Sequence, residues 1–324
     1  MQFKGKLPLA HPALPAPTRR TFLLPIAGIA VALSALACSG SHNPLAPLPP
    51  AQSAAPVPPI PSSAGDAVFV GAGDIAVCGS DSTEATARLL DRFASSVFVL
   101  GDNVYPSGTA EQYANCYEPT WGRHRNRTYA APGNHDWDAS AGAPYFAYFG
   151  TRAGPSGLGY YSFDLGGWHV LSLNSNVPAH SGSPQYEWVR NDLLVAPRAC
   201  TIAYWHHPLF SSGAHGNNPQ MADVWRLLSE SGAEVVLTGH DHHYERFAPQ
   251  DADGRFDPHG VRQFVVGTGG APLRAAVAGQ SNSEVVESQT WGVLKLTLRS
   301  TTYDWEFVPI DGQSFRDFGS GNCQ

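Results

Sequence analysis

The sequence is poor in basic residues once its first 38 residues are set aside. Four of its 20 Lys and Arg residues lie in that segment, which holds no acid, so 16 basic residues face 27 acidic ones in the rest of the chain. The formal charge of that part is −11, and Lys295 is its single lysine. Sequence-independent binding to nucleic acid needs a basic footprint. The composition therefore argues against a nucleic-acid partner. The sequence also has 13 histidines, which are the first candidates for functional residues.

The apolar run near the N-terminus is short for a membrane-spanning helix. Residues 22–37 form 16 uncharged, mostly apolar positions, and a span needs about 20. The run contains a proline and ends in small residues, as the apolar region of an export signal does. Residues 18–23 resemble a twin-arginine signal, whose pathway exports folded proteins. We therefore expect residues 1–38 to be an export signal, with an uncleaved membrane anchor as the alternative.

The end of this signal supports two processing routes. Ala35 and Ala37 form an Ala-x-Ala site, which would release a soluble secreted protein. A small residue directly before Cys38 also resembles a lipobox, which would make Cys38 a lipidated N-terminus. The lipoprotein is favoured, because a cysteine at this position would otherwise be a coincidence. We expect a periplasmic or cell-surface lipoprotein, or a secreted protein, whose membrane contact would be a lipid at Cys38.

Two further segments follow the signal. Residues 39–65 are mainly proline, alanine and serine with almost no charge, a composition typical of an extended, semi-rigid linker. Residues 66–324 alternate short apolar runs with amphipathic stretches and end in a strand-rich third. With 8 Trp, 12 Tyr and 15 Phe in the sequence, the core can be sizeable. This order predicts one α/β domain of two mixed sheets covered by helices.

Four cysteines remain in this exported domain, so disulfides are expected. Four cysteines allow three pairings. Cys78 and Cys116 each lie shortly after a motif at the end of a predicted strand, which favours that pair and leaves Cys200 with Cys323. The sequence alone does not choose among the three.

Five predicted strands run into polar clusters. In open α/β sheets, ligands bind beyond the carboxyl ends of strands, so these side chains should converge. They offer carboxylate, amide and imidazole ligands without a thiolate, which suits iron, manganese or zinc. With a nearby tyrosine the set has seven members, too many for one ion but suited to two ions that share a carboxylate. The seven are Asp74, Asp102, Tyr105, Asn134, His206, His240 and His242.

The motifs that carry these residues resemble the calcineurin-like metallophosphoesterases. In order, they are Gly73-Asp74, Gly101-Asp102-x-x-Tyr105, Gly133-Asn134-His135-Asp136, His206-x-Pro208 and Gly239-His240-x-His242. Within that superfamily, the chain is similar to purple acid phosphatases of the small, single-domain form. Three features carry this closer likeness: Ala76 in place of a histidine, Tyr105, and the run Tyr244-Glu245-Arg246. The resemblance implies a four-layer αββα sandwich with the metal site at the carboxyl ends of the strands.

The resemblance also implies a role for each ligand. Asp74, Tyr105 and His242 would hold the first metal, Asp102 would bridge, and Asn134, His206 and His240 would hold the second. A Tyr105 phenolate favours Fe(III), beside a divalent Fe, Zn or Mn ion. His207 directly follows His206, which leaves open which of the two binds; Pro208 favours His206.

Three residues would lie outside the metal shell. By resemblance, His135 would bind phosphate or protonate the leaving group, with Asp136 to orient it, and His215 would meet the substrate. The implied activity is phosphomonoester hydrolysis, in which a metal-bound hydroxide attacks phosphorus. A phosphodiesterase on the same scaffold is the alternative, and a surface-tethered binding protein without turnover is a third hypothesis.

Overall fold

The structure is a computed structural model that describes residues 66–195 and 200–324. The predicted export signal, with Cys38, and the predicted linker lie outside the described residues. Within the described ranges, no helix combines the length and the apolar character needed to cross a bilayer.

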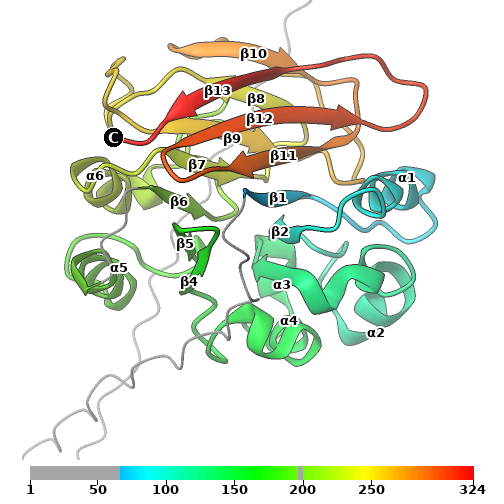
Figure 1. The fold of residues 1–324 in the computed structure, drawn as a ribbon. Helices are drawn as coiled ribbons and strands as arrows, with labels where there is room; N and C mark the ends of the chain where they lie inside the picture. The colour runs from blue at the N-terminus through cyan, green and yellow to red at the C-terminus, as the bar shows by residue number, and fades with distance from the viewer. Residues whose placement is uncertain (1–65, 196–199) are drawn as a thin grey trace, which may run out of the picture. The chain divides into compact units, whose positions relative to one another are not determined.

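The first sheet has six strands in the order β13-β12-β11-β1-β2-β3 (Figure 1). β1, β2 and β3 are parallel, and β11, β12 and β13 extend the sheet through antiparallel pairs. Their bounds are Ala67–Ala72 (β1), Ser96–Leu100 (β2), Thr128–Ala131 (β3), Gly292–Leu298 (β11), Thr302–Pro309 (β12) and Phe318–Asn322 (β13).

The second sheet has seven strands in the order β10-β8-β9-β7-β6-β5-β4. β5, β6, β7 and β9 form a parallel centre, and β4, β8 and β10 pair antiparallel at its two sides. Their bounds are Tyr161–Leu165 (β4), Trp168–Ser172 (β5), Thr201–Tyr204 (β6), Val235–Thr238 (β7), Tyr244–Phe247 (β8), Arg262–Val266 (β9) and Ser283–Glu287 (β10).

Helices flank the two sheets on separate sides (Figure 1). α1 to α4 and the short helices η1 to η3 lie beside β1–β3, whereas η4, α5 and α6 accompany the second sheet. Their bounds are Asp81–Leu90 (α1), Ala110–Gln112 (α2), Tyr113–Tyr117 (η1), Trp121–Arg127 (η2), Asn134–Asp138 (α3), Ala143–Phe149 (α4), Gly150–Ala153 (η3), Pro184–Val195 (α5), Pro219–Met221 (η4) and Ala222–Glu230 (α6).

Aromatic side chains join the two sheets in the core. Phe69 of β1 lies 5.9 Å from Tyr204 of β6 and 6.2 Å from Phe163 of β4, measured between ring centroids. A second apolar cluster, which includes Trp205 and Trp225, packs α6 against the outer face of the second sheet. The expected α/β fold with two mixed sheets covered by helices is therefore confirmed.

The described disulfides have the favoured pairing. Cys78 is bonded to Cys116, which ties the loop after β1 to η1. Cys200 is bonded to Cys323, which ties the start of β6 to the chain's last residues.

Candidate metal centre and active site

The loops after β1, β2, β3, β6 and β7 bring the seven predicted ligands together. In the first half of the site, the Tyr105 hydroxyl lies 2.9 Å from Asp74 Oδ1 and 3.1 Å from Asp102 Oδ2 and from His242 Nε2. His242 Nε2 lies 3.4 Å from Asp74 Oδ1. The three residues expected at the first metal thus form one group, with Asp102 at its edge.

Asp102 also reaches the second half of the site. Its Oδ2 atom lies 3.3 Å from His206 Nε2. That nitrogen is 3.1 Å from Asn134 Oδ1 and 3.1 Å from His240 Nδ1. Asp102 therefore faces both groups, which fits its predicted role as the shared ligand.

Three of these residues hold an unusual backbone conformation. Asp74, Asp102 and His240 have φ of 58°, 50° and 70°, a left-handed region in which a non-glycine residue costs about 1–3 kcal/mol. Neighbouring contacts hold it, since the amide of Asp74 donates to the Gly101 carbonyl at 3.0 Å and that of His240 to Asp74 Oδ2 at 2.8 Å. A Cβ on Gly133 would collide with the Asp102 carboxylate. Such strain is concentrated where function fixes a side-chain position.

The site buries two carboxylates without a permanent positive partner. Asp74 is 0 % and Asp102 2 % exposed. Among the described residues, their ion-pair partners are histidines only, with no Arg or Lys within 4.0 Å. Buried, uncompensated charge costs several kcal/mol per group. Because a pair of cations would compensate both carboxylates, the residues present fit a metal centre.

Local charges shift the pKa values of this group. Burial alone would raise the pKa of Asp102, but the charges of His206 and His135 lower it well below its usual range. Burial, together with Asp74 and Asp102, raises the pKa of Tyr105 well above its ordinary 10.0. Without a cation, Tyr105 is therefore a neutral donor, and a metal bound by its phenolate would have to displace that proton.

The histidines are oriented by their second ring nitrogens. His206 Nδ1 lies 2.8 Å from the Leu100 carbonyl, and His242 Nδ1 lies 2.8 Å from the Pro272 carbonyl. A carbonyl can only accept, so both Nδ1 atoms carry hydrogen and Nε2 faces the site. Burial lowers the pKa of His206, but Asp102 raises it to about 9. In the absence of a cation a proton occupies this Nε2, so metal binding should release protons.

His135 lies beside the centre with one ring nitrogen fixed. Its Nδ1 is 2.6 Å from the Pro106 carbonyl, and its Nε2 is 3.8 Å from Asp102 Oδ2. Its backbone amide donates to Asp102 Oδ1 at 2.8 Å. The ring is 34 % exposed, so Nε2 is accessible to a substrate at the site.

Asp136 does not have the expected position beside the His135 ring. Its buried carboxylate accepts hydrogen bonds from the Tyr113 hydroxyl at 2.6 Å, the Gly133 amide at 2.8 Å and the Asn103 side chain at 2.9 Å. The Pro106 carbonyl orients His135 instead. Asp136 follows the motif but turns inward, where its carboxylate accepts from the buried amides of Gly133, directly before α3, and of Asn103.

His215 lies at the rim, with a partner that the sequence did not suggest. Its ring centroid is 4.3 Å from that of His240, and its Nε2 accepts from Arg274 Nη1 at 2.8 Å. The Arg274 amide donates to the His242 carbonyl at 2.9 Å, which anchors the arginine to the metal-site loop. Arg274 belongs to the irregular segment between β9 and β10, and no local pattern marks it.

The environments of His206 and His207 differ, which bears on which of the two would bind a metal. His206 is fully buried, and its Nε2 lies within 3.3 Å of Asn134, Asp102 and His240 atoms. His207 is half-buried, and its Nδ1 faces Ser175 Oγ at 2.8 Å. Two overlapping sets have a geometry that could hold an ion: Asp74, Asp102 and His206, and His206, His207 and His240. Contacts on both sides make His206 the better ligand candidate.

Comparison with known proteins identifies a family. The calcineurin-like phosphoesterase family profile matches residues 67–244, more than half of the chain. Purple acid phosphatase 15 of Arabidopsis thaliana is 29 % identical over 247 residues, which cover 63 % of this chain and 46 % of the relative. Purple acid phosphatase 18 of the same plant is 36 % identical over 117 residues, which cover 34 % of this chain and 26 % of the relative. The chain therefore spans about half or less of these relatives.

Solved structures share the fold. A purple acid phosphatase from yellow lupin (Lupinus luteus) seeds aligns with a TM-score of 0.67 at 20 % identity, covering 81 % of this chain and 55 % of that one. An anchor protein of the Plasmodium inner membrane complex aligns with a TM-score of 0.64 at 15 % identity, covering 80 % of this chain and 89 % of that one. At these identities the likeness concerns the fold alone.

Proposed function

The chain belongs to the calcineurin-like phosphoesterase family, and from that premise we propose that it is a binuclear metal-dependent phosphomonoesterase of the purple acid phosphatase type. One observation supports this most strongly. Asp74 and Asp102 are buried without Arg or Lys partners among the described residues, and Asp102 lies between the two groups of predicted ligands. Two positive ions would balance this charge, and a phosphate ester would bring negative charge to them.

The seven side chains would divide as the family resemblance assigns them. Asp74, Tyr105 and His242 would hold the first ion and Asn134, His206 and His240 the second, with Asp102 shared. Two ions in such a centre, when bound, activate a water and neutralise charge on the transferred phosphoryl group.

The chain's own residues would handle the leaving group. His135 Nδ1 donates to the Pro106 carbonyl, so its exposed Nε2 is the atom that can face an ester oxygen, and it acts as a donor there when the ring carries a second hydrogen. Proton transfer from a positioned histidine typically contributes about 10²–10⁴-fold to rate. His215 and Arg274 would supply further donors at the rim, where the guanidinium has N–H groups left after its bond to His215.

Substrate comparison tests the reaction class. We expect the metal-loaded full chain to hydrolyse nitrophenyl phosphate faster than its bis-ester; the reverse order would assign a phosphodiesterase. Asp102→Ala and His206→Ala should abolish hydrolysis with the circular dichroism spectrum retained. If the wild type binds two metals but hydrolyses neither ester, the binding-protein hypothesis replaces this proposal.

The metal pair is tested by colour and composition. A Tyr105 phenolate on Fe(III) would give a visible charge-transfer band, and Tyr105→Phe should abolish it. Elemental analysis should find iron with a second Fe, Zn or Mn ion. A colourless, iron-free protein with full activity would overturn the ferric assignment and favour zinc or manganese.

We further propose that residues 1–38 direct export, that residues 39–65 act as a linker and that Cys38 carries a lipid. The two disulfides are consistent with export to an oxidising compartment. Membrane fractionation of the wild type and of Cys38→Ser tests the lipid. We expect the wild type to stay in the membrane fraction and the variant to appear in the soluble fraction. Equal amounts of both proteins in the soluble fraction would favour the soluble secreted route.

A further inference from the structure

His207 lies beside the second half of the site and has no role in the proposed ligand set. Its ring centroid is 4.4 Å from that of His240 and 4.9 Å from that of His206. A ring nitrogen of each of the three histidines lies within 4.8 Å of the others. His207 is half-buried, whereas His206 is fully buried. It is therefore near enough to a bound ester to contact it, and its role depends on which ring nitrogen carries hydrogen.

Ser175 determines that tautomer. Its buried Oγ accepts the His207 backbone N–H at 3.0 Å and lies 2.8 Å from His207 Nδ1. Within the described residues, His207 Nδ1 is the single acceptor near the Ser175 hydroxyl hydrogen. The hydrogen bonds of both groups are satisfied together when the hydroxyl donates to Nδ1. A neutral His207 then carries its hydrogen on Nε2.

The neighbouring ligand candidates have the opposite arrangement. The Nδ1 atoms of His206 and His242 donate to main-chain carbonyls, so their Nε2 lone pairs are available to a metal ion. His207 Nε2 has no hydrogen-bond partner among the described residues. In this tautomer Nε2 carries a hydrogen, which suits a donor to an anion better than a ligand for a cation.

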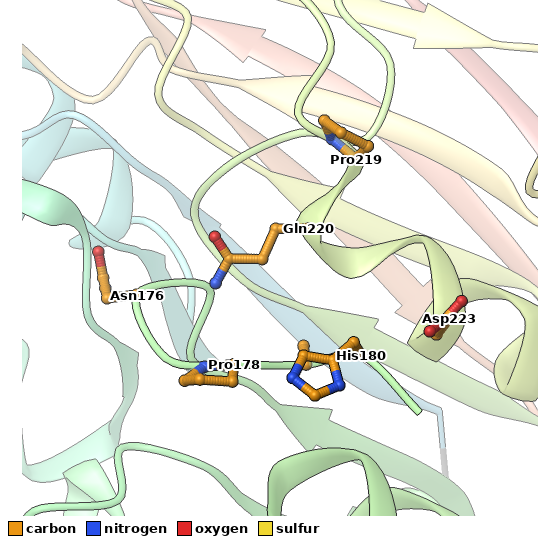
Figure 2. Close-up of a pocket in the computed structure, with 7 residues that line it drawn as sticks. Asn176, Pro178, His180, Pro219, Gln220 and Asp223 are labelled. Atoms are coloured by element: carbon orange, nitrogen blue, oxygen red, sulfur yellow. The ribbon is translucent and has the colours of Figure 1, made fainter. Parts of the chain in front are cut away.

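A cleft begins one residue beyond Ser175. Asn176 lines it, and its Nδ2 donates to the carbonyls of Pro132 and Gly133 at 3.2 and 3.3 Å, directly before Asn134. The cleft has a volume of about 480 Å³, within the range of small-molecule sites. Figure 2 shows Pro178 and His180 on one side of it and Pro219, Gln220 and Asp223 on the other.

The charge of this cleft restricts its occupant. Its lining residues include the Asp223 carboxylate and no Arg or Lys. Asp223 is itself held by the Ser181 amide at 2.8 Å and by Arg226 Nη1 at 2.7 Å. Amide, imidazole, proline and alanine groups make up the rest, which suits an uncharged, hydroxyl-bearing group better than a second anion.

We propose that His207 is a further substrate-binding residue: its Nε2–H donates to an oxygen of the phosphate ester, and the uncharged alcohol portion of the ester lies in the cleft that begins at Asn176. This inference rests on the proposed function, because it assigns the two ends of that reaction's substrate. Ser175 is a positioning residue that keeps the hydrogen on Nε2.

Phosphate binding tests His207 without requiring turnover. We compare His207→Ala and His207→Gln in the metal-loaded full chain by calorimetric titration with inorganic phosphate. Because a hydrogen bond to a charged group contributes about 1.5–3 kcal/mol, loss of the donor should weaken binding at least about 10-fold. The glutamine variant, which retains an N–H donor, should recover part of the affinity, and Ser175→Ala should lower it less. Metal content should remain at the wild-type level in all three variants.

Two outcomes would overturn the assignment of His207. A loss of metal from His207→Ala would make it a ligand, and unchanged phosphate affinity would make it a bystander. If the wild type binds metals and phosphate but hydrolyses no ester, the proposed function fails, yet the titration still decides whether His207 contacts phosphate.

The cleft is tested by steric block and by charge. Pro178 and Pro258 are both exposed loop prolines, and only the first lines the cleft. We expect Pro178→Trp to lower kcat/KM for a sugar phosphate at least about 10-fold while ethyl phosphate changes little, with Pro258→Trp as the matched control. The wild type should also prefer glycerol phosphate to phosphoglycolate. Equal effects of Pro178→Trp on large and small esters, or a preference for the charged alcohol, would overturn this part.

Discussion

Two regions of this protein bury acidic side chains in opposite ways. At the metal-site end, Asp74 and Asp102 are enclosed with histidines and a tyrosine. In the C-terminal ion cluster (Tyr244, Arg246, Glu284, Trp305 and Asp317), the Asp317 carboxylate accepts from the Tyr244 hydroxyl at 2.6 Å, Arg246 Nε at 2.8 Å and Trp305 Nε1 at 3.2 Å. Asp317 is thus paired with an arginine, whose charge is permanent, whereas the site acids have only histidine and tyrosine neighbours among the described residues.

A single stretch of sequence supplies both regions. Residues 239–246 place His240 and His242 in the metal site and then enter β8, where Tyr244 and Arg246 reach the ion cluster. His240 has a positive φ of 70°, while residues from Tyr244 onward have regular strand pairing. Strained backbone with carboxylates that lack Arg or Lys partners therefore occurs where chemistry is proposed, and regular backbone with an arginine-paired carboxylate where only the fold needs support.

The largest expected effect is a loss of activity that follows substitution of Asp102 but not of Asp317. Loss of a residue that hydrogen-bonds a metal ligand typically lowers metal affinity or activity about 10- to 100-fold. Asp102→Asn alters a predicted ligand that both ions share, so it should lower kcat by more than about 100-fold. Asp317→Asn, the matched change in the ion cluster, should leave kcat within about 3-fold at temperatures where the variant is folded. Steady-state kinetics on nitrophenyl phosphate checks both, and equal losses would remove the distinction.

Metal removal should act on one region alone. An ion present at about 100 times its dissociation constant stabilises the folded state by about 2.7 kcal/mol, so a chelator should lower the unfolding free energy of the wild type by an amount of this order. In Asp102→Asn the same chelator should have a smaller effect, because a shared ligand is missing. Denaturant titrations with and without chelator measure the difference; equal shifts in the two proteins would contradict it.

Breaking the ion cluster should reduce stability and spare function. Arg246→Met leaves the buried Asp317 carboxylate without its cation, and loss of one partner of a buried pair costs about 3 kcal/mol. We expect that decrease in urea unfolding, with kcat/KM retained at low temperature. The double variant with Asp317→Asn should recover part of the loss, since no unpaired charge remains. No recovery would mean that Arg246 acts through its packing on Trp305.

The smallest expected effect is a pH dependence of the same cluster. Burial alone would raise the pKa of Asp317, but Arg246 and Tyr244 lower it below its ordinary 3.8. A depressed folded pKa contributes stability above the unfolded value, which is lost as pH falls from about 3.8 through the folded pKa. The stability difference between wild type and Asp317→Asn should therefore narrow as pH falls through this window. Denaturant titrations at stepped pH measure it, and a constant difference would rule out this linkage.

Much of the fold was predictable because the parallel strands carry strong apolar patterns. β8, β10 and β13 have weaker local patterns. β8 continues directly from the histidine motif, β10 alternates partly buried and exposed residues, and β13 contains two glycines. Their pairing comes from neighbours distant in sequence, such as Thr302 opposite Asn322.

The candidate site was predictable for a related reason. Asp74, Asp102 and Asn134 each follow a short apolar strand, and parallel strands present their carboxyl ends to one edge. Their roles as ligands stay a prediction, but their proximity is a fact of the structure. Arg274 could not be found in this way, since it lies in an irregular segment and is held at the site by its main-chain hydrogen bond to His242 and its side-chain hydrogen bond to His215.

The sequence by itself determined three things: that polar motifs follow successive strands, which residue types these motifs contain, and that acidic residues outnumber basic ones. These follow from local patterns, because apolar periodicity and glycine-containing turns act over a few residues. Only the tertiary structure decided that Asp136 supports a loop while Pro106 orients His135, and that His207 faces a serine. A ring nitrogen's partner depends on which distant backbone or hydroxyl group packing brings within 3 Å, and a local pattern does not encode that.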